Sequence, residues 1–154
     1  MYGLGTTVYV ERDAEILVMK RATGALAGQW FLPGGGAEEG ESPEECARRE
    51  VLEETGLAID GELELVGVYV MWVYGRDVLN VSYRGRAVGE VVVSHEHTAA
   101  RWVDPVRWRA TMTDELLDRL GRGDPKVARL VHGVRDDFDR YLRALSRPAP
   151  PAPG

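Results

Sequence analysis

Three glutamates, Glu50, Glu53 and Glu54, stand three and four residues apart near the middle of the chain. Because each residue of an α-helix turns by about 100°, their side chains would share one face of a helix. Like charges at this spacing repel one another and destabilise a helix. A divalent cation would turn that repulsion into coordination, and carboxylate oxygens suit Mg²⁺ or Mn²⁺. The spacing therefore indicates a metal site, with a solvated acidic helix face as the alternative.

The residues around these glutamates favour the metal site. A run of three glycines, Gly34–Gly36, precedes the expected helix, and we expect it to form a loop in which the backbone can approach a ligand closely. Arg49 lies next to Glu50 in the same helix and is placed to pair with a flanking carboxylate and hold its rotamer. A glycine loop followed by a carboxylate-bearing helix is suited to binding an anionic substrate through a metal ion.

Residues 35–57 read GGAEEGESPEECARREVLEETGL and resemble the Nudix box, Gx5Ex7REUxEExGU, in which U is a bulky aliphatic residue. The nine fixed positions of that pattern are all filled, by Gly35, Glu41, Arg49, Glu50, Val51, Glu53, Glu54, Gly56 and Leu57. The resemblance implies a MutT-like Nudix hydrolase with an α/β fold, an α/β/α sandwich around a mixed β-sheet. It also implies hydrolysis of a nucleoside diphosphate linked to a group X, which gives a nucleoside monophosphate and phosphorylated X.

The resemblance further implies roles for single residues, with Mg²⁺ or Mn²⁺ as the cofactor. Its metal ligands would be three carboxylates and one backbone carbonyl, those of Glu50, Glu53, Glu54 and Gly35. Glu41 and Arg49 would hold the loop and the helix in position. A metal-bound water has a lowered pKa, and a carboxylate such as Glu53 could accept its proton. We therefore count Glu53 and Arg49 among the catalytic candidates.

Four residues outside the box are further candidates. Glu96 lies in the short loop Ser94–His97, where MutT-like proteins often carry an extra metal ligand or base; the alternative is an exposed loop carboxylate. Arg21 ends an expected strand and could bind phosphate, or could be a surface arginine. Trp30 and Tyr74 could stack on a base, or could pack in the core or at its rim.

The substrate is less closely defined than the reaction. No proline lies about fifteen residues after the box, which argues against an ADP-ribose type. Tyr74 lies seventeen residues after Leu57, a weak feature of dinucleoside-polyphosphate hydrolases. The single-domain length and the Glu96 loop favour a nucleoside triphosphate. A non-catalytic, nucleotide-sensing Nudix domain remains an alternative, whereas an isopentenyl diphosphate isomerase is disfavoured because Cys46 lies inside the box helix.

Patterning predicts the elements that would position these residues. Ser42, Pro43 and Glu45 form a helix start with a capping box, and Gly56 suits a left-handed C-terminal position. The expected helices are 43–55, a turn at 105–109, 113–120 and 125–145. The expected strands are two within 6–21, then 30–32, 63–74 paired as a hairpin with 78–88, 91–93 and 100–103.

Composition limits the remaining possibilities. The 154 residues suit one domain, expected over 1–146, with a disordered Pro- and Ala-rich tail at 147–154. The formal net charge of −6 disfavours binding to a nucleic acid polymer. One cysteine excludes an intrachain disulfide, and we find neither a membrane span nor a signal peptide. We expect a cytoplasmic protein, and the family resemblance suggests a homodimer.

Overall fold

The computed structural model describes residues 2–24, 26–73 and 75–147. The elements along the chain are β1 (Gly3–Arg12), β2 (Glu15–Arg21), β3 (Trp30–Phe31), β4 (Gly34–Gly36), α1 (Pro43–Thr55), β5 (Ala58–Val73), β6 (Arg76–Val88), β7 (His97–Val103), α2 (Pro105–Ala110), α3 (Asp114–Gly121) and α4 (Pro125–Leu145). The predicted bounds of the helices 43–55 and 125–145 are confirmed.

The strands form one mixed sheet. Its main path runs β3-β2-β1-β6-β5, while β4 also pairs with β1 and β7 also pairs with β2. β1 and β6 run parallel from Gly3 opposite Val78 to Glu11 opposite Arg86, and the other pairs are antiparallel. The predicted hairpin is confirmed as β5 and β6, although β5 begins at Ala58 rather than Leu63.

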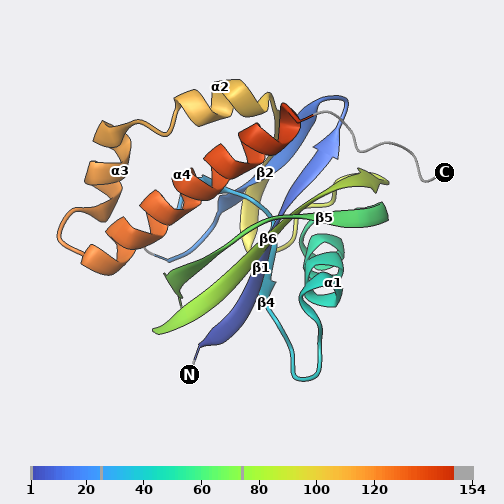
Figure 1. The fold of residues 1–154 in the computed structure, drawn as a ribbon, viewed down its shortest axis with the longest axis horizontal. Coiled ribbons are helices and arrows are strands. Elements are labelled where there is room, and N and C mark those ends of the chain that lie inside the picture. The colour runs from blue at the N-terminus through green and yellow to red at the C-terminus, as the bar shows by residue number, and fades with distance from the viewer. Residues whose placement is uncertain (1, 25, 74, 148–154) are drawn as a thin grey trace.

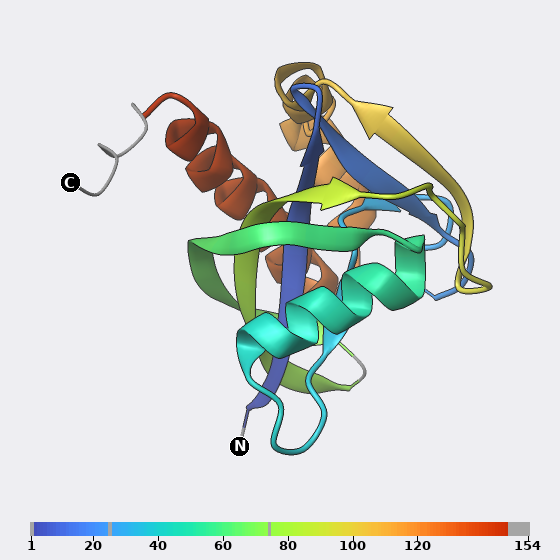
Figure 2. The ribbon, with the colours of Figure 1, turned by 90° about the vertical axis from the view of Figure 1, so that its right-hand side faces the viewer.

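Helices cover both faces of the sheet, as Figures 1 and 2 show: α1 lies on one face, and α4 with α2 and α3 lies on the other. Each face has its own buried cluster. Val8 and Leu17 pack with Val51 of α1, whereas Tyr9 packs with Phe138 of α4. The predicted α/β/α sandwich is therefore confirmed.

Local capping explains why α1 begins and ends where it does. The Ser42 hydroxyl accepts a hydrogen bond from the amide of Glu45 at 3.2 Å, and Pro43 occupies the first turn, where it needs no amide hydrogen. Gly56 ends the helix with φ 74°, a left-handed conformation that glycine adopts without a Cβ clash. Within the described residues, the return bond from the Glu45 side chain that would complete a capping box is not made.

Two predictions about local structure are wrong. Gly34–Gly36 is not a loop but the short strand β4, which pairs with Gly5–Thr7 of β1. A Cβ at Gly34 would collide with the backbone of Thr6, so the absence of side chains permits this close pairing. Residues 91–93 form no strand; the Val92 amide donates instead to the Thr55 carbonyl at 2.7 Å, at the end of α1.

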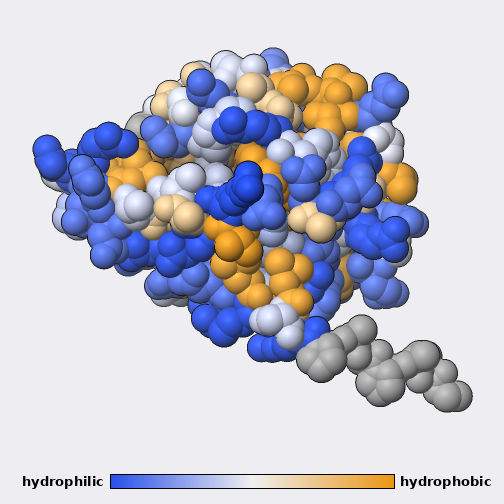
Figure 3. All heavy atoms as spheres, turned by 90° about the horizontal axis from the view of Figure 1, so that it is seen from above, coloured by the Kyte–Doolittle hydropathy of each residue, from blue (hydrophilic) through white to orange (hydrophobic). Residues whose placement is uncertain are grey.

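The surface seen from above in Figure 3 has the mainly hydrophilic character expected of a face exposed to water. Figure 3 shows the face seen from above, where hydrophilic residues predominate and hydrophobic areas are interspersed among them. In the described ranges, no helix has the length and apolar character that crossing a bilayer requires. The predicted tail, from 148 onward, lies outside the described residues.

Candidate active site

The glutamates of the box line a cavity of about 250 Å³, here called the acidic cleft. One wall is the glycine strand β4, a second is α1, and the third is the loop before β7. The lining residues are Gly34, Gly35, Gly36, Glu50, Glu53, Glu54, Ser94, His95 and Glu96. The fold thus brings Glu96 to the box glutamates, more than 40 residues away in the sequence.

Glu54 is the most deeply buried carboxylate of the acidic cleft, with 8% of the residue exposed. Burial, together with the nearby carboxylates of Glu50 and Glu96, raises its pKa to about 8. The amide of Gly34 donates to its Oε2 at 2.9 Å and opposes that shift. Burial also raises the pKa of Glu50. A site that penalises these anionic carboxylates in the absence of a cation is suited to binding one.

Arg49 joins the loop before α1 to the helix itself. Its guanidinium donates two hydrogen bonds to Glu41, at 2.6 and 2.9 Å, and one to the Gly36 carbonyl at 3.0 Å. The Glu41 pKa falls to about 2 because of this pair. The same guanidinium reaches Glu50 at 2.9 Å and Glu53 at 3.1 Å. Arg49 therefore fixes the loop and keeps two carboxylates at the edge of the cleft.

Gly35 brings a backbone carbonyl next to the carboxylates. A Cβ at this position would overlap the Glu50 carboxyl group, so glycine is required for the two to lie this close. The buried Cys46 thiol faces the Gly35 carbonyl at 3.6 Å and the Thr6 hydroxyl at 3.3 Å. Cys46 thus packs under β4, and burial raises its pKa, as expected for a thiol that does no chemistry.

Two hydrogen bonds hold the Glu96 loop against its neighbours. The Ser94 amide donates to the Glu54 carbonyl at 3.3 Å, and the Ala22 amide donates to the Glu96 carbonyl at 3.1 Å. Within the loop, the Ser94 hydroxyl and His97 Nδ1 are 3.2 Å apart. Burial lowers the His97 pKa, which favours a neutral ring. The loop is therefore anchored both to the end of α1 and to the chain just after β2.

The donor set of the acidic cleft fits a hard divalent cation. Apart from the His95 imidazole, the groups that line the cleft offer oxygen ligands, mainly carboxylates, as Mg²⁺ and Mn²⁺ prefer. Across the described part of the chain, no three acidic, histidine or cysteine side chains already converge as a ligand group. Arg49 pairs with one oxygen of Glu50 and one oxygen of Glu53, so it competes with a cation for these two carboxylates while each keeps its second oxygen.

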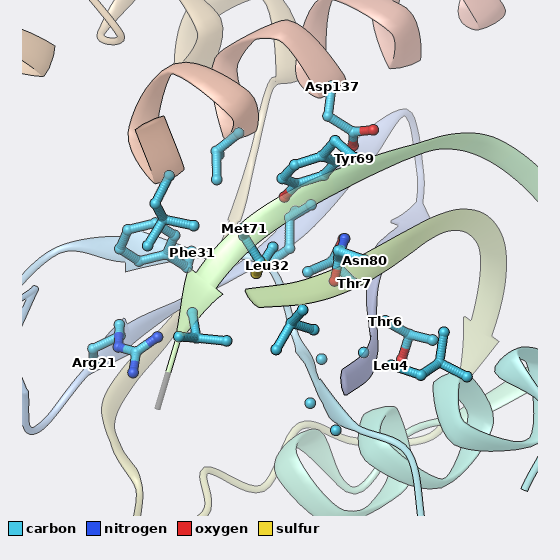
Figure 4. Close-up of a pocket in the computed structure, with 18 of the residues that line it drawn as sticks. Leu4, Thr6, Thr7, Arg21, Phe31, Leu32, Tyr69, Met71, Asn80 and Asp137 are labelled. Carbon is cyan, nitrogen blue, oxygen red and sulfur yellow. The ribbon is translucent and has the colours of Figure 1, made fainter. Parts of the chain in front are cut away.

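A second, apolar cavity of about 140 Å³ adjoins the acidic cleft and shares its wall Gly34–Gly36. Figure 4 shows its lining, with Phe31 and Met71 on one side and Asn80 and Thr7 on another. Its side chains come from β1, β2, β3, β5, β6 and α4. Aromatic, aliphatic and a few polar groups around one hollow are typical of a small-molecule site.

Comparisons with known proteins identify the family. A family model described as the NUDIX domain matches residues 1–120. The chain belongs to the Nudix family. Its relatives include a MutT-like protein from Streptomyces ambofaciens, 36% identical over 78% of this chain and 77% of the relative. The nucleoside triphosphatase NudI of Escherichia coli is 32% identical over 62% of this chain and 77% of its own length. The crystal structure of a MutT protein from Methanosarcina mazei superposes with a TM-score of 0.69 at 26% identity, covering 95% of this chain and 96% of the other.

The two predicted substrate-binding residues that the structure describes, Arg21 and Trp30, are lining residues of different hollows. Arg21 lines the apolar cavity, and its charge lowers the pKa of Glu54 in the acidic cleft. Trp30 lines a separate hollow of about 100 Å³ beside Trp108, with the Arg101 guanidinium 4.4 Å from its ring centroid. Tyr74 lies outside the described residues.

Sequence reasoning missed the polar residues of the apolar cavity. Thr7 and Asn80 lie on neighbouring strands, β1 and β6, and Asp137 lies on α4. A signal for Asn80 was present: it is an amide within the otherwise apolar run Val78–Val81, where an unpaired amide would be costly to bury.

Proposed function

We propose that this Nudix hydrolase is a metal-dependent pyrophosphohydrolase that cleaves a nucleoside triphosphate or a related nucleotide to the nucleoside monophosphate. One observation carries the proposal: a carboxylate-lined cleft and an apolar cavity share a wall of glycine backbone. A phosphate chain suits the first and a nucleoside suits the second. The names of the MutT-like relative and of the nucleoside triphosphatase NudI agree with this substrate class.

The acidic cleft is the proposed cation site. We assign its ligands to Glu50, Glu53, Glu54 and Glu96 and to the Gly35 carbonyl. A Mg²⁺ or Mn²⁺ ion bound there would neutralise phosphate charge and lower the pKa of a bound water. Arg49 would then keep Glu41 while the cation competes with it for Glu50 and Glu53, so the loop would retain its position.

Two exposed carboxylates are proposed as alternative proton acceptors. Glu53 and Glu96 both line the cleft, and both are accessible to a water molecule beside a phosphate. In the hydrolysis, the oxygen of water bonds to phosphorus, the bond from that phosphorus to the bridging oxygen breaks, and a proton passes to the base. Arg21, which lines the apolar cavity, is proposed to hold a phosphate oxygen through its guanidinium.

Turnover of a panel of nucleotides tests the proposal. Nucleoside triphosphates, dinucleoside polyphosphates and ADP-ribose are incubated with Mg²⁺, and products are identified by mass spectrometry. We expect a nucleoside monophosphate and pyrophosphate from a triphosphate, and complete loss of turnover in excess chelator with recovery on added Mg²⁺ or Mn²⁺. Undiminished hydrolysis in chelator would reject the metal site. Cleavage of dinucleoside polyphosphates alone would replace the substrate class, and binding without cleavage would favour a nucleotide sensor.

Three wider expectations stay predictions: a single domain over 1–146, a cytoplasmic location and a homodimer. Size-exclusion chromatography with light scattering measures the last of these directly. A mass of about one chain in solution would reject it.

A further inference from the structure

The apolar cavity contains a side-chain amide that is fixed in place but only partly hydrogen bonded. Asn80 is 2% exposed, and its Nδ2 donates to the Thr7 hydroxyl at 3.0 Å (Figure 4). In the parallel pairing of β1 with β6, Thr6 lies opposite Val81, so Thr7 and Asn80, the residues on either side of this pair, face each other diagonally across the two strands. This register sets the contact between them. Burial of an amide is costly unless its hydrogen bonds are made, so the Thr7 bond orients the Asn80 side chain.

The remaining polar atoms of Asn80 face the cavity. In the described part of the chain, Oδ1 and the second Nδ2 hydrogen have no hydrogen-bond partner. Asn80 lines the cavity, and its Oδ1 is not sealed in the core, because among the described residues Arg140 Nε is the one buried side-chain atom left without a partner. Asn80 therefore offers an acceptor and a donor, side by side, to whatever occupies an otherwise apolar hollow.

The other buried polar side chains of the cavity, Thr6 and Asp137, are already used, and the Thr6 hydroxyl lies 3.3 Å from the Cys46 sulfur. The Asp137 carboxylate accepts from the Tyr9 hydroxyl at 2.7 Å, the Ser82 hydroxyl at 2.7 Å and Arg140 at 3.2 Å. These bonds tie α4 to β1 and β6, so Asp137 acts in the packing of the fold. Asn80 is thus the buried polar side chain of this cavity that has free hydrogen-bonding capacity.

We propose that Asn80, oriented by Thr7, reads the hydrogen-bonding edge of the nucleobase and determines base selectivity; this rests on the proposed function. On the purine edge that carries N7, a planar amide can pair with adenine, which presents the N6 donor beside the N7 acceptor, but not with guanine, which presents the two acceptors O6 and N7. A correct bidentate pair discriminates by roughly 10- to 100-fold against a base that cannot form it. The apolar lining, including Phe31 and Met71, holds the ring without distinguishing its edge.

Binding of the four common nucleoside monophosphates tests this role without any need for turnover. Calorimetry compares the wild type with Asn80→Leu and Asn80→Asp, and kcat/KM is measured for the matching triphosphates. We expect the wild type to prefer some bases, and Asn80→Leu to reduce that preference by roughly 10-fold or more. Asn80→Asp replaces the donor by an acceptor, so selectivity should shift toward guanine, whose N1 and N2 groups are both donors.

Two further variants keep the test independent of folding. Met71→Leu changes an apolar lining residue at nearly constant volume and should leave the base preference unchanged. Thr7→Val removes the anchor but keeps Asn80, and should weaken the preference partially. The melting temperature of each variant is compared with the wild type to show that it is folded.

The inference and the proposed function can fail separately. If the wild type cleaves no nucleotide but binds monophosphates with a preference that depends on Asn80, the proposed function is rejected and the inference stands. If nucleotides are cleaved and Asn80→Leu keeps the wild-type preference, the inference is overturned. Equal binding of all four monophosphates by the wild type, or binding of none, overturns it as well.

Discussion

The acidic cleft and the apolar cavity share the glycine wall Gly34–Gly36, yet they are built in opposite ways. In the cleft, three carboxylates come from one helix, α1, and burial raises the pKa of two of them. In the cavity, side chains from five strands and α4 enclose a largely apolar hollow. The contrast separates chemistry from recognition. Variants in the cleft should change kcat, whereas variants in the cavity should change KM or selectivity.

The largest effect is expected for Glu53→Gln, which removes one charge from the cleft at constant volume. We expect kcat to fall by about 10²–10³, as on removal of a well-placed electrostatic group. The fold should be retained, since the Glu53 side chain is 57% exposed. Glu44→Gln, an exposed glutamate of the first turn of α1 outside the cleft, is the matched control. Near wild-type turnover for Glu53→Gln at saturating Mg²⁺ would remove Glu53 from the site.

Glu96→Gln tests whether the loop before β7 contributes chemistry or only a ligand. If Glu96 is the base, kcat should fall by roughly 10²-fold with little change in KM, and the ascending limb of the pH profile should change. Glu90→Gln, in the same connection but outside the cleft, is the control. Turnover within about twofold of the wild type at saturating Mg²⁺ would assign the base to Glu53. A shifted Mg²⁺ titration would then identify Glu96 as a ligand.

Phe31→Ala should weaken binding of the nucleoside end of the proposed substrate. Its ring lines the apolar cavity, so its loss should raise KM by about tenfold, the scale of stacking on one base, with kcat nearly unchanged. Trp30→Ala, at the neighbouring residue of β3, is an informative comparison because Trp30 lines only the hollow beside Trp108, whereas Phe31 lines both that hollow and the apolar cavity. A rise in KM for Trp30→Ala but not for Phe31→Ala would place the base in that hollow.

The sequence predicted the elements whose boundaries are set locally. Helix α1 was correct at both ends because Ser42 and Gly56 cap it through contacts within a few residues. Gly34–Gly36 was wrong because glycine runs usually indicate loops, whereas here their small size lets the backbone pair with β1. The valines at 91–93 have strand propensity, but the Val92 amide bonds to the end of α1.

The difference between local contacts and contacts distant in the sequence also explains how much of the site could be predicted. The acidic cleft was predictable because most of its groups lie within residues 34–54, at helical spacing and in a specific motif. The apolar cavity was not, because its lining spans residues 4–137 and depends on strand order and register. The contact between Thr7 and Asn80 follows from the parallel pairing of β1 and β6, which no local pattern predicted.

The smallest expected effect is on the stability of the folded protein. It arises because ionising a buried carboxylate of the acidic cleft is unfavourable when no metal ion is bound. Glu54 has a pKa of about 8 in the folded protein, against an ordinary value of 4.5, chiefly because it is buried. The folded state therefore binds this proton more tightly than the unfolded state does. The resulting stabilisation is complete below about pH 4.5 and is lost as the pH rises toward 8. In chelator, the melting temperature should fall by roughly 10 °C over that interval.

Glu54→Gln isolates this contribution, because the amide keeps an oxygen to accept from Gly34 but cannot ionise. The melting temperature of this variant should vary less with pH than that of the wild type, and the two curves should diverge as the pH approaches 8. Added Mg²⁺ should stabilise the wild type more at pH 8 than at pH 6, since a cation binds the ionised carboxylate and stabilises the folded state through that binding. Superimposable pH curves for the two proteins in chelator would show that burial does not penalise the Glu54 charge, and the electrostatic contrast between the cleft and the cavity would then rest on Glu50 alone.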